Sequence, residues 1–205
     1  VRDRHLSVAI VDEARAQAVR MLREVGIDAG RPYVLLHPGA SAQARRYPPE
    51  RFGAVAALLT GAGWQVLVTG VEREGAILSV VMERAPLAKL LMGRTTLPDY
   101  AALVERAALV LCNDSLPLHL ADALRTPEVV LYSGTEYEEQ WRPRATRARL
   151  LRRPTPCQPC YLFECPIGLP CLDIPPEEVA AAALEMLAEV GIAQASEAVA
   201  GGGVR

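Results

Sequence analysis

Residues 109–119 read LVLCNDSLPLH, and this stretch decides the fold class. Its first four residues form an apolar run without polar alternation, which is typical of a strand buried on both faces of a parallel sheet. A polar turn at residues 113–115 ends the run, and Pro117 suits the first turn of a helix that extends to about Leu124. The stretch therefore predicts a strand, a tight turn and a helix, which is the repeating unit of an α/β domain.

Similar short apolar runs occur on both sides of this stretch, separated by segments of helical length. They are residues 33–36, 66–68, 129–132 and, less distinctly, 89–91. Thr96 and Asp99 have the spacing of a capping box, and Asp12 is expected to cap the first helix. The pattern predicts an α/β domain with a doubly wound, mostly parallel, Rossmann-like sheet.

Composition shifts along the chain predict its division into five parts. From about Arg142 the sequence is rich in Arg, Pro and Cys and shows no strand pattern, and a helix is expected to begin at Pro175 and Pro176. The predicted parts are a linker and first helix (1–30), the sheet domain (31–155), a four-cysteine loop (156–173), a C-terminal helix packed on the domain (174–191) and a flexible tail (192–205).

The overall composition indicates an ordinary globular protein. The chain has 205 residues, 51% of them hydrophobic, and a net charge of −2. A hydrophobic content this high excludes a wholly disordered chain. A near-neutral balance argues against a nucleic-acid partner, because phosphate binding needs a broad positive field. Since no apolar run is long enough to cross a membrane, a cytoplasmic protein is expected.

In a sheet of this kind, ligands bind beyond the carboxyl ends of the strands. The turns that follow the predicted strands are therefore the places to look for chemistry. They are residues 37–46, 69–75, 92–96, 112–116 and 133–135. None of them contains the Gly-x-Gly-x-x-Gly fingerprint or a Gly-Lys-Ser/Thr loop, which excludes the two commonest nucleotide-binding motifs.

Two of these turns carry groups suited to anions. After residues 37–41, HPGAS, come Arg45 and Arg46, and arginine binds phosphate oxygens in a bidentate manner. Asp114 and Ser115 lie at a helix start, where the dipole favours a diphosphate. The alternatives are a plain turn with solvated arginines, an Asp114 that only caps the helix, and a His119 that is structural.

Taken together and in order, three segments resemble glycosyltransferase family 9, the ADP-heptose:lipopolysaccharide heptosyltransferases. They are HPGAS (37–41) with RRYP (45–48), NDS (113–115) with His119, and PCQPCY (156–161) with Cys165. The resemblance covers about residues 30–190 and matches the C-terminal half of that family, whose members have two facing Rossmann-like domains of the B type. It implies that residues 31–155 bind a nucleotide-sugar donor, while the missing N-terminal domain supplies the acceptor surface and the catalytic base.

The resemblance also implies an inverting, metal-independent transfer that needs no cofactor. Arg45 or Arg46 would stabilise the departing diphosphate and Asp114 would position the donor sugar, which makes these three the catalytic candidates. The implied substrate-binding residues are Gly39, Ala40, Ser41, Glu74, Gly93, Thr95, Asn113, Ser115, Leu116 and His119. The implied partners are an ADP-heptose-like donor and an acceptor that is lipopolysaccharide core or a lipid-linked glycan.

One departure from the family pattern keeps a second function open. Leu116 stands where the family has glycine, and a side chain there could obstruct the approach of phosphate to the backbone. The alternative is a degenerate nucleotide-sugar-binding module without turnover.

The cysteines raise a third possibility. Cys157, Cys160, Cys165 and Cys171 lie in a proline-rich loop, close enough in sequence to converge on zinc or an iron–sulfur cluster. Their spacing matches neither a standard zinc ribbon nor a ferredoxin. Two disulfides or free thiols are the alternatives, and bound metal would favour a metal-stabilised interaction domain.

Six arginines fall within residues 142–153. They could face a phosphorylated glycan or the anionic inner face of the plasma membrane, which would make the protein peripheral there. The alternative is a solvated arm whose charge Glu136, Glu138 and Glu139 offset.

Overall fold

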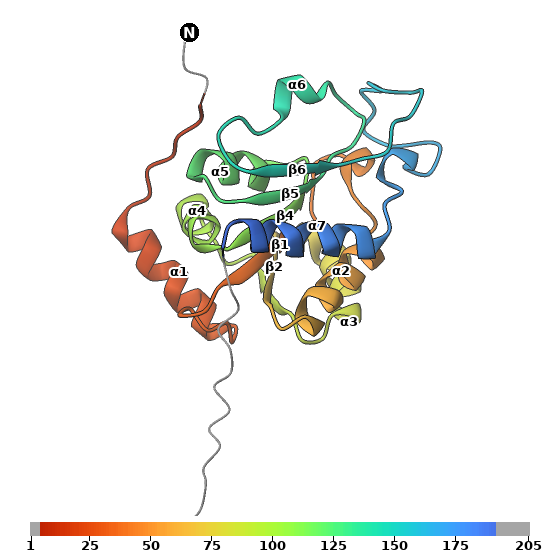
Figure 1. The fold of residues 1–205 in the computed structure, drawn as a ribbon. Coiled ribbons are helices and arrows are strands. Elements are labelled where there is room, and N and C mark those ends of the chain that lie inside the picture. The colour runs from red at the N-terminus through yellow and green to blue at the C-terminus, as the bar shows by residue number, and fades with distance from the viewer. Residues whose placement is uncertain (1–4, 192–205) are drawn as a thin grey trace, which may run out of the picture.

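The computed structural model describes residues 5–191, and a six-stranded parallel sheet forms its centre (Figure 1). Along the sheet the strands follow the order β3-β2-β1-β4-β5-β6. Their bounds are β1 Tyr33–His37, β2 Gln65–Gly70, β3 Lys89–Met92, β4 Leu109–Asn113, β5 Glu128–Leu131 and β6 Ala148–Leu151. Because the order reverses between β1 and β4, a ligand crevice is expected outside the carboxyl ends of these two strands.

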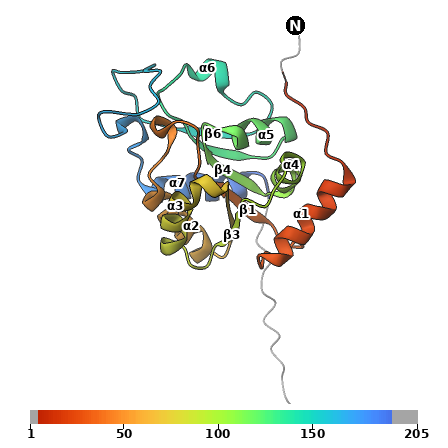
Figure 2. The same ribbon diagram turned by 180° about the vertical axis from the view of Figure 1, so that it is seen from behind.

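Helices cover both faces of the sheet, as the front and back views show (Figures 1 and 2). The α-helices are α1 Asp12–Glu24, α2 Pro49–Gly61, α3 Gly75–Arg84, α4 Leu97–Arg106, α5 Leu116–Leu124, α6 Glu138–Trp141 and α7 Pro176–Glu189. Short 3₁₀ helices are η1 Gln43–Arg45, η2 Glu72–Glu74 and η3 Pro170–Leu172. Helices α2, α3 and α7 pack on one face and α1, α4 and α5 on the other. The doubly wound α/β prediction is confirmed.

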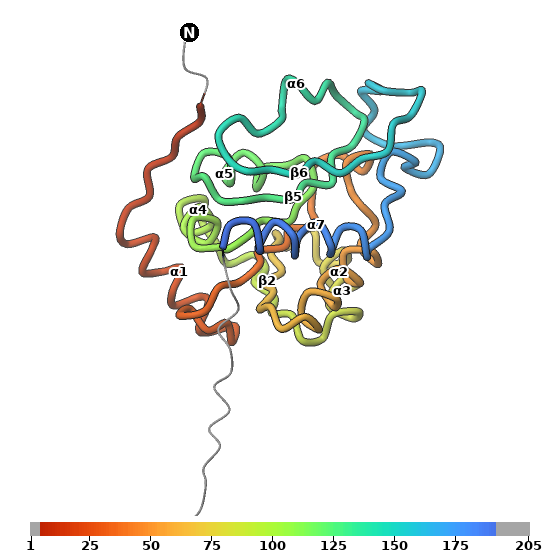
Figure 3. Tube along the Cα trace, in the orientation of Figure 1, coloured from red at the N-terminus to blue at the C-terminus, as the bar shows by residue number. Residues whose placement is uncertain are grey.

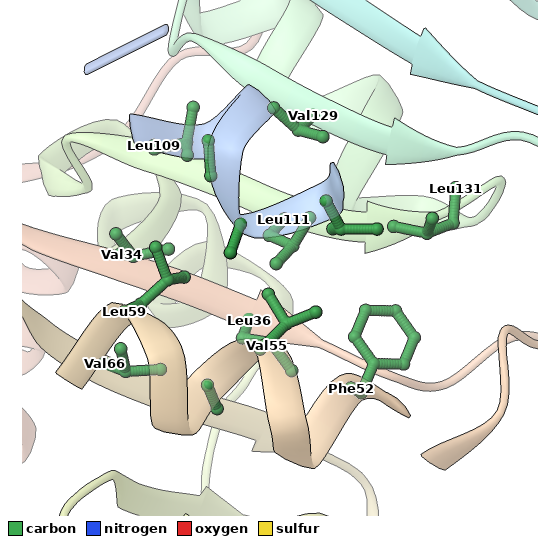
Figure 4. Packing of buried hydrophobic residues seen from close by; sticks show 14 of the residues in the cluster. Val34, Leu36, Phe52, Val55, Leu59, Val66, Leu109, Leu111, Val129 and Leu131 are labelled. Atoms are coloured by element: carbon green, nitrogen blue, oxygen red, sulfur yellow. The ribbon is translucent and has the colours of Figure 1, made fainter. Parts of the chain in front are cut away.

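The inner strands are mainly apolar because both of their faces are buried. In β1, Val34 and Leu36 point toward α2 and α7, whereas Tyr33 and Leu35 pack on the α1 and α4 side. Figure 4 shows the first of these layers, where Val55 of α2 meets the strand residues. All five side chains are fully or almost fully buried, so this packing fixes the strand ends that carry the site.

Two sequence-based expectations about elements were wrong. The segment after Arg142 was expected to hold no strand, yet β6 pairs in parallel with β5. This strand is only half-buried and carries Arg149, so it lacks the apolar run that marks the other strands. Asp12 does not cap α1, since it is the first helical residue and Val11 stands at the cap. The capping box of Thr96 and Asp99 is confirmed.

Glutamates from two helices form ion pairs with four of the six arginines of residues 142–153. Arg149 forms ion pairs with Glu185 and Glu189 of α7, and Arg153 pairs with Glu178 of the same helix. Arg142 and Arg152 both lie near Glu138 of α6, at 3.8 and 3.4 Å. These pairs favour a charge-compensated arm over a cationic surface for a membrane. Among residues 5–191, no helix is both long and apolar enough to cross a membrane. The flexible tail expected at 192–205 lies outside the described residues.

Glu128 is a buried acid at the start of β5, far from the carboxyl ends of the strands. It has no exposed surface, and within the described residues neither carboxylate oxygen has a hydrogen-bond partner. Burial raises the pKa of Glu128 from 4.5 to about 9, and Asp122 adds to this shift. The folded protein therefore holds a proton that the unfolded chain releases above pH 4.5, so stability falls as the pH rises toward 9.

Replacing Glu128 with glutamine should remove this pH dependence, because glutamine carries no ionisable group. Between pH 5 and pH 7, the contribution of Glu128 should lower the wild-type free energy of unfolding by about 2 to 3 kcal/mol, because each pH unit between the two pKa values corresponds to about 1.4 kcal/mol. Urea unfolding at both pH values measures the difference. The exposed variant Glu139→Gln should keep the wild-type dependence, and equal dependence in Glu128→Gln would contradict the assignment.

Candidate active site

A cavity of about 470 Å³ opens at the carboxyl ends of β1, β2, β4 and β5. It lies in the crevice that the strand order predicts. Its lining residues come from the turns that follow these strands and from the start of α5. They are His37, Ala40, Ser41, Arg45, Val71, Arg73, Glu74, Asp114, Ser115, Leu116, His119, Glu136 and Trp141. Most of the site residues proposed from sequence are thus brought together.

The two neighbouring arginines have different surroundings. Arg45, in η1, lines the cavity, donates from Nε to Thr135 Oγ1 at 3.2 Å and forms an ion pair with Glu136. Arg46 is not among the lining residues, and its Nε donates to the carbonyl oxygen of Ala40 at 2.8 Å. Arg45 is therefore placed to meet an anion in the cavity, whereas Arg46 stabilises the turn after β1.

Asp114 contributes a buried carboxylate to the cavity. It is 3% exposed, and its Oδ2 has no hydrogen-bond partner among the described residues. Burial raises the pKa of Asp114 to about 6; Arg45 opposes this shift and Glu136 adds to it. A buried oxygen without a partner is costly unless a ligand supplies the missing donor. A sugar hydroxyl has the required chemistry.

The start of α5 forms the wall next to Asp114. Ser115 is the N-cap residue, and its Oγ donates to the carbonyl oxygen of Asn113 at 3.3 Å. Pro117 has no N–H group, and Leu118 N donates to Ser115 O at 3.1 Å. A phosphate at this helix start could therefore accept hydrogen bonds from the N–H groups of Ser115 and Leu116. The positive end of the helix dipole would also attract it.

Glu74 lines the cavity, and its carboxylate lies against Gly39. Glu74 is 8% exposed, and its Oε2 accepts from the N–H of Val71 at 3.0 Å. A Cβ on residue 39 would collide with the Glu74 carboxylate, so any residue other than glycine there would force that carboxylate to move. Glu74 lines the cavity, while Gly39 itself does not.

Asn113 was proposed from sequence as a substrate-binding residue, but its side chain is engaged behind the site. It has no exposed surface. Its Oδ1 accepts from Tyr47 N at 3.0 Å, and its Nδ2 donates to Pro38 O at 2.8 Å. Asn113 therefore ties the end of β4 to both ends of the turn that carries Arg45.

A smaller cavity of about 200 Å³ adjoins the first, and the two share His37, Val71 and Leu116. Thr95 and Leu97 line this smaller cavity. Most of its other lining side chains are apolar or carry a hydroxyl group. Burial lowers the pKa of His37, which favours a neutral imidazole there.

Leu116 is 52% exposed and lines both cavities. Gly93 lines neither; it has a φ of +66°, and its N–H donates to Gly70 O at 3.0 Å.

Five lining residues were not among the site residues proposed from sequence: His37, Val71, Arg73, Glu136 and Trp141. Glu136 directly follows the turn at 133–135, so its position after a predicted strand was the available signal. Arg73 lies beside Glu74 in η2, and nothing separated it from an ordinary surface residue. Trp141 lies in the short helix α6 and contacts His119, with ring centroids 5.9 Å apart. Burial lowers the pKa of His119.

The four cysteines of residues 156–173 are free thiols. Cys157 is exposed, Cys160 and Cys165 are partly exposed, and Cys171 is buried, which raises the pKa of the Cys171 thiol. Across residues 5–191, no three Cys, His, Asp or Glu side chains are arranged to hold a metal ion. Zinc or iron–sulfur binding by these cysteines therefore stays a prediction without geometric support.

A family model described as glycosyltransferase family 9 (heptosyltransferase) matches residues 5–169. This chain belongs to glycosyltransferase family 9. The match spans every strand of the sheet and all of the cavity residues named above. Membership confirms the family resemblance drawn from the three sequence segments.

Relatives of this family 9 chain are lipopolysaccharide and lipooligosaccharide heptosyltransferases. Lipopolysaccharide heptosyltransferase 3 of Escherichia coli is 33% identical over 131 residues, which are 60% of this chain and 38% of that protein. Lipooligosaccharide heptosyltransferase 2 of Campylobacter jejuni is 27% identical over 166 residues, 77% of this chain and 52% of that protein. The chain thus spans about half or less of the curated relatives it matches.

A solved structure has the same fold. The family 9 glycosyl transferase of Veillonella parvula DSM 2008 superposes with a TM-score of 0.77 at 24% identity. The superposition covers 90% of this chain and 54% of that chain. This agreement confirms the Rossmann-like architecture of the chain.

Proposed function

We propose that this chain is the donor-binding half of an inverting glycosyltransferase that acts in lipopolysaccharide or related surface-glycan assembly. One observation carries the proposal: a cavity at the carboxyl edge brings together Arg45, the start of α5 and an Asp114 oxygen that has no hydrogen-bond partner among residues 5–191. A cation and a helix N-terminus suit a diphosphate, and a carboxylate suits sugar hydroxyls.

In this proposal the chain stabilises the leaving group. An acceptor hydroxyl attacks the anomeric carbon as the bond to the diphosphate breaks, so negative charge develops on the diphosphate. Arg45 and the N–H groups of Ser115 and Leu116 compensate this charge, and the transfer needs no metal ion. Asp114 accepts from donor-sugar hydroxyls, and Glu74 accepts from the ribose. The acceptor site and the general base belong to the other half of the protein.

The names of the relatives support a proposal for the donor. The matched relatives are named as heptosyltransferases of lipopolysaccharide or lipooligosaccharide. We therefore infer an ADP-heptose-like donor, with the base in the smaller cavity beside Thr95 and Leu97. The acceptor in this proposal is lipopolysaccharide core or a lipid-linked glycan, reached from the inner face of the plasma membrane.

Calorimetric titration with ADP, GDP and UDP tests the donor-binding proposal. One nucleotide, ADP, should bind saturably with a stoichiometry of one, and the other two should bind more weakly. Circular dichroism of the same sample establishes that the fold is intact. Absence of saturable binding for all three nucleotides in a folded sample would contradict the proposal.

Replacing Glu136 with glutamine should strengthen nucleotide binding. In the ligand-free site the Glu136 carboxylate forms an ion pair with the Arg45 guanidinium. A diphosphate must therefore compete with Glu136 for Arg45. Glutamine removes the competing charge, so the dissociation constant for ADP should fall about three- to tenfold, because charged contacts of this kind contribute about 1 kcal/mol or more.

The same titration measures this effect, and Glu139→Gln serves as a charge-matched control outside the cavity. The control should bind ADP like the wild type. Weaker binding by Glu136→Gln would mean that Glu136 contacts the ligand instead of competing with it.

A further inference from the structure

The cysteine loop runs beside the turn that carries Arg45, although more than a hundred residues separate them in sequence. The tube and both ribbon views show the blue loop segment next to the orange segment after β1 (Figures 1, 2 and 3). We refer to residues 158–165, within this loop, as the bracing segment. Its contacts fall on two walls of the large cavity.

The first wall is η1, which holds Arg45. The N–H of Ala44 donates to the carbonyl oxygen of Phe163 at 2.9 Å. The N–H of Cys165 donates to the side-chain oxygen Oε1 of Gln43 at 3.0 Å. Two hydrogen bonds thus attach the two residues immediately before Arg45 to the bracing segment.

The second wall is the turn after β5, which holds the groups that Arg45 contacts. Cys160 N donates to Gly134 O at 3.2 Å, and Tyr161 N donates to Thr135 O at 2.8 Å. The Gln158 side chain packs so closely on Gly134 that a Cβ there would collide with it. The bracing segment therefore also fixes the backbone next to Glu136.

The sheet does not join these two walls directly. They follow β1 and β5, and β4 lies between those strands. Arg45 bridges the walls through Thr135 and Glu136, so its position depends on how far apart they are held. The bracing segment is bonded to both.

We propose that Gln43 is a positioning residue, which acts through the bracing segment to hold Arg45 at the diphosphate site. This inference rests on the proposed donor-binding function. Gln43 is exposed and is not among the residues that line the cavity, so it has no direct contact with a ligand there. Its effect on binding passes through the arginine two residues later.

The variant Gln43→Met removes the acceptor oxygen and keeps the side-chain length. ADP should bind it about three- to tenfold more weakly than the wild type, since one hydrogen bond that orders η1 is lost. In an Arg45→Met background, the same change should have no further effect on the dissociation constant, because coupled residues are non-additive. Gln17→Met, on the exposed side of α1, is the matched control and should bind like the wild type.

A second measurement needs no nucleotide. Amide hydrogen exchange, followed by NMR, should be faster for Ala44 and Arg45 in Gln43→Met than in the wild type, while amides of β4 should be unchanged. Unchanged exchange at Ala44 and Arg45 would overturn the inference.

The outcomes separate this inference from the proposed function. If the wild type binds none of ADP, GDP and UDP, the proposed function fails, and exchange alone decides whether Gln43 holds Arg45. If Arg45→Met weakens binding and Gln43→Met does not, the inference is overturned while the function stands. Equal weakening by Gln43→Met with and without Arg45 would also overturn it, because the effect would then bypass the arginine.

Discussion

Replacing Arg45 with alanine is expected to weaken ADP binding about ten- to a hundredfold, a larger change than we expect for Glu136→Gln or Gln43→Met. A charge-assisted hydrogen bond contributes about 1.5 to 3 kcal/mol, and about 1.4 kcal/mol corresponds to a factor of ten. The loss is compounded because Glu136 then has no cationic partner beside the diphosphate. Titration calorimetry measures the dissociation constant directly.

Arg46→Ala is the matched control for this experiment. Arg46 donates to Ala40 O and does not line the cavity, so its loss should change the dissociation constant by no more than about threefold. The double variant Arg45→Ala/Glu136→Gln should recover part of the lost affinity, because the unpaired carboxylate is gone. If Arg46→Ala proved the more damaging change, the assignment of Arg45 to the diphosphate would be wrong.

Replacing Asn113 with alanine should lower the free energy of unfolding by about 3 kcal/mol. The side chain satisfies the buried N–H of Tyr47 and the carbonyl oxygen of Pro38. Alanine leaves both backbone groups without a partner, and each unsatisfied buried group costs about 1 to 3 kcal/mol. Urea unfolding followed by circular dichroism measures the loss.

Ser115→Ala is the comparison for stability, because Ser115 also makes a hydrogen bond at the end of β4. That bond is longer, at 3.3 Å, and the residue is partly exposed, so the loss should be about 1 kcal/mol or less. A similarly small loss for Asn113→Ala would show that water or local rearrangement satisfies Tyr47 and Pro38, and that Asn113 does not hold the turn.

The sheet could be predicted from the sequence because its inner strands are buried on both faces. Runs such as residues 33–36 and 109–112 contain no polar residue. This pattern is typical of strands that are buried on both faces of a sheet. The same reasoning failed at β6, which lies at the edge of the sheet and is half-buried. An edge strand tolerates Arg149, whose charge reaches Glu185 and Glu189 on α7, and these partners are distant in sequence.

For the site, the sequence indicated which turns matter but not how each side chain lies. The rule that ligands bind beyond the carboxyl ends of strands located the turns at 37–46 and 112–116. The rule could not predict which of Arg45 and Arg46 lines the cavity, because the two residues are adjacent and have the same side chain. Nor could it show that Asn113 is engaged behind the site, because its partners come from another turn.

The cysteine loop illustrates a different limit of sequence reasoning. Its spacing drew attention to thiol chemistry, whereas the structure shows main-chain bonds from Cys160 and Cys165 to the cavity walls. Backbone N–H groups donate these bonds, and nearly every residue carries one. The residue types in the loop therefore could not predict these contacts. The metal prediction for the four thiols remains to be tested by metal analysis of the purified protein.

Backbone NMR with added ADP shows directly whether the nucleotide occupies the carboxyl-edge cavity. We predict that ADP shifts the amide resonances of Ser41 to Arg45 and of Ser115, Leu116 and Leu118, with smaller changes near Thr95 and Leu97. Arg45→Ala should greatly reduce these shifts at the same subsaturating ADP concentration. Shifts confined to residues outside the carboxyl-edge cavity, or no shifts at millimolar ADP, would contradict the account.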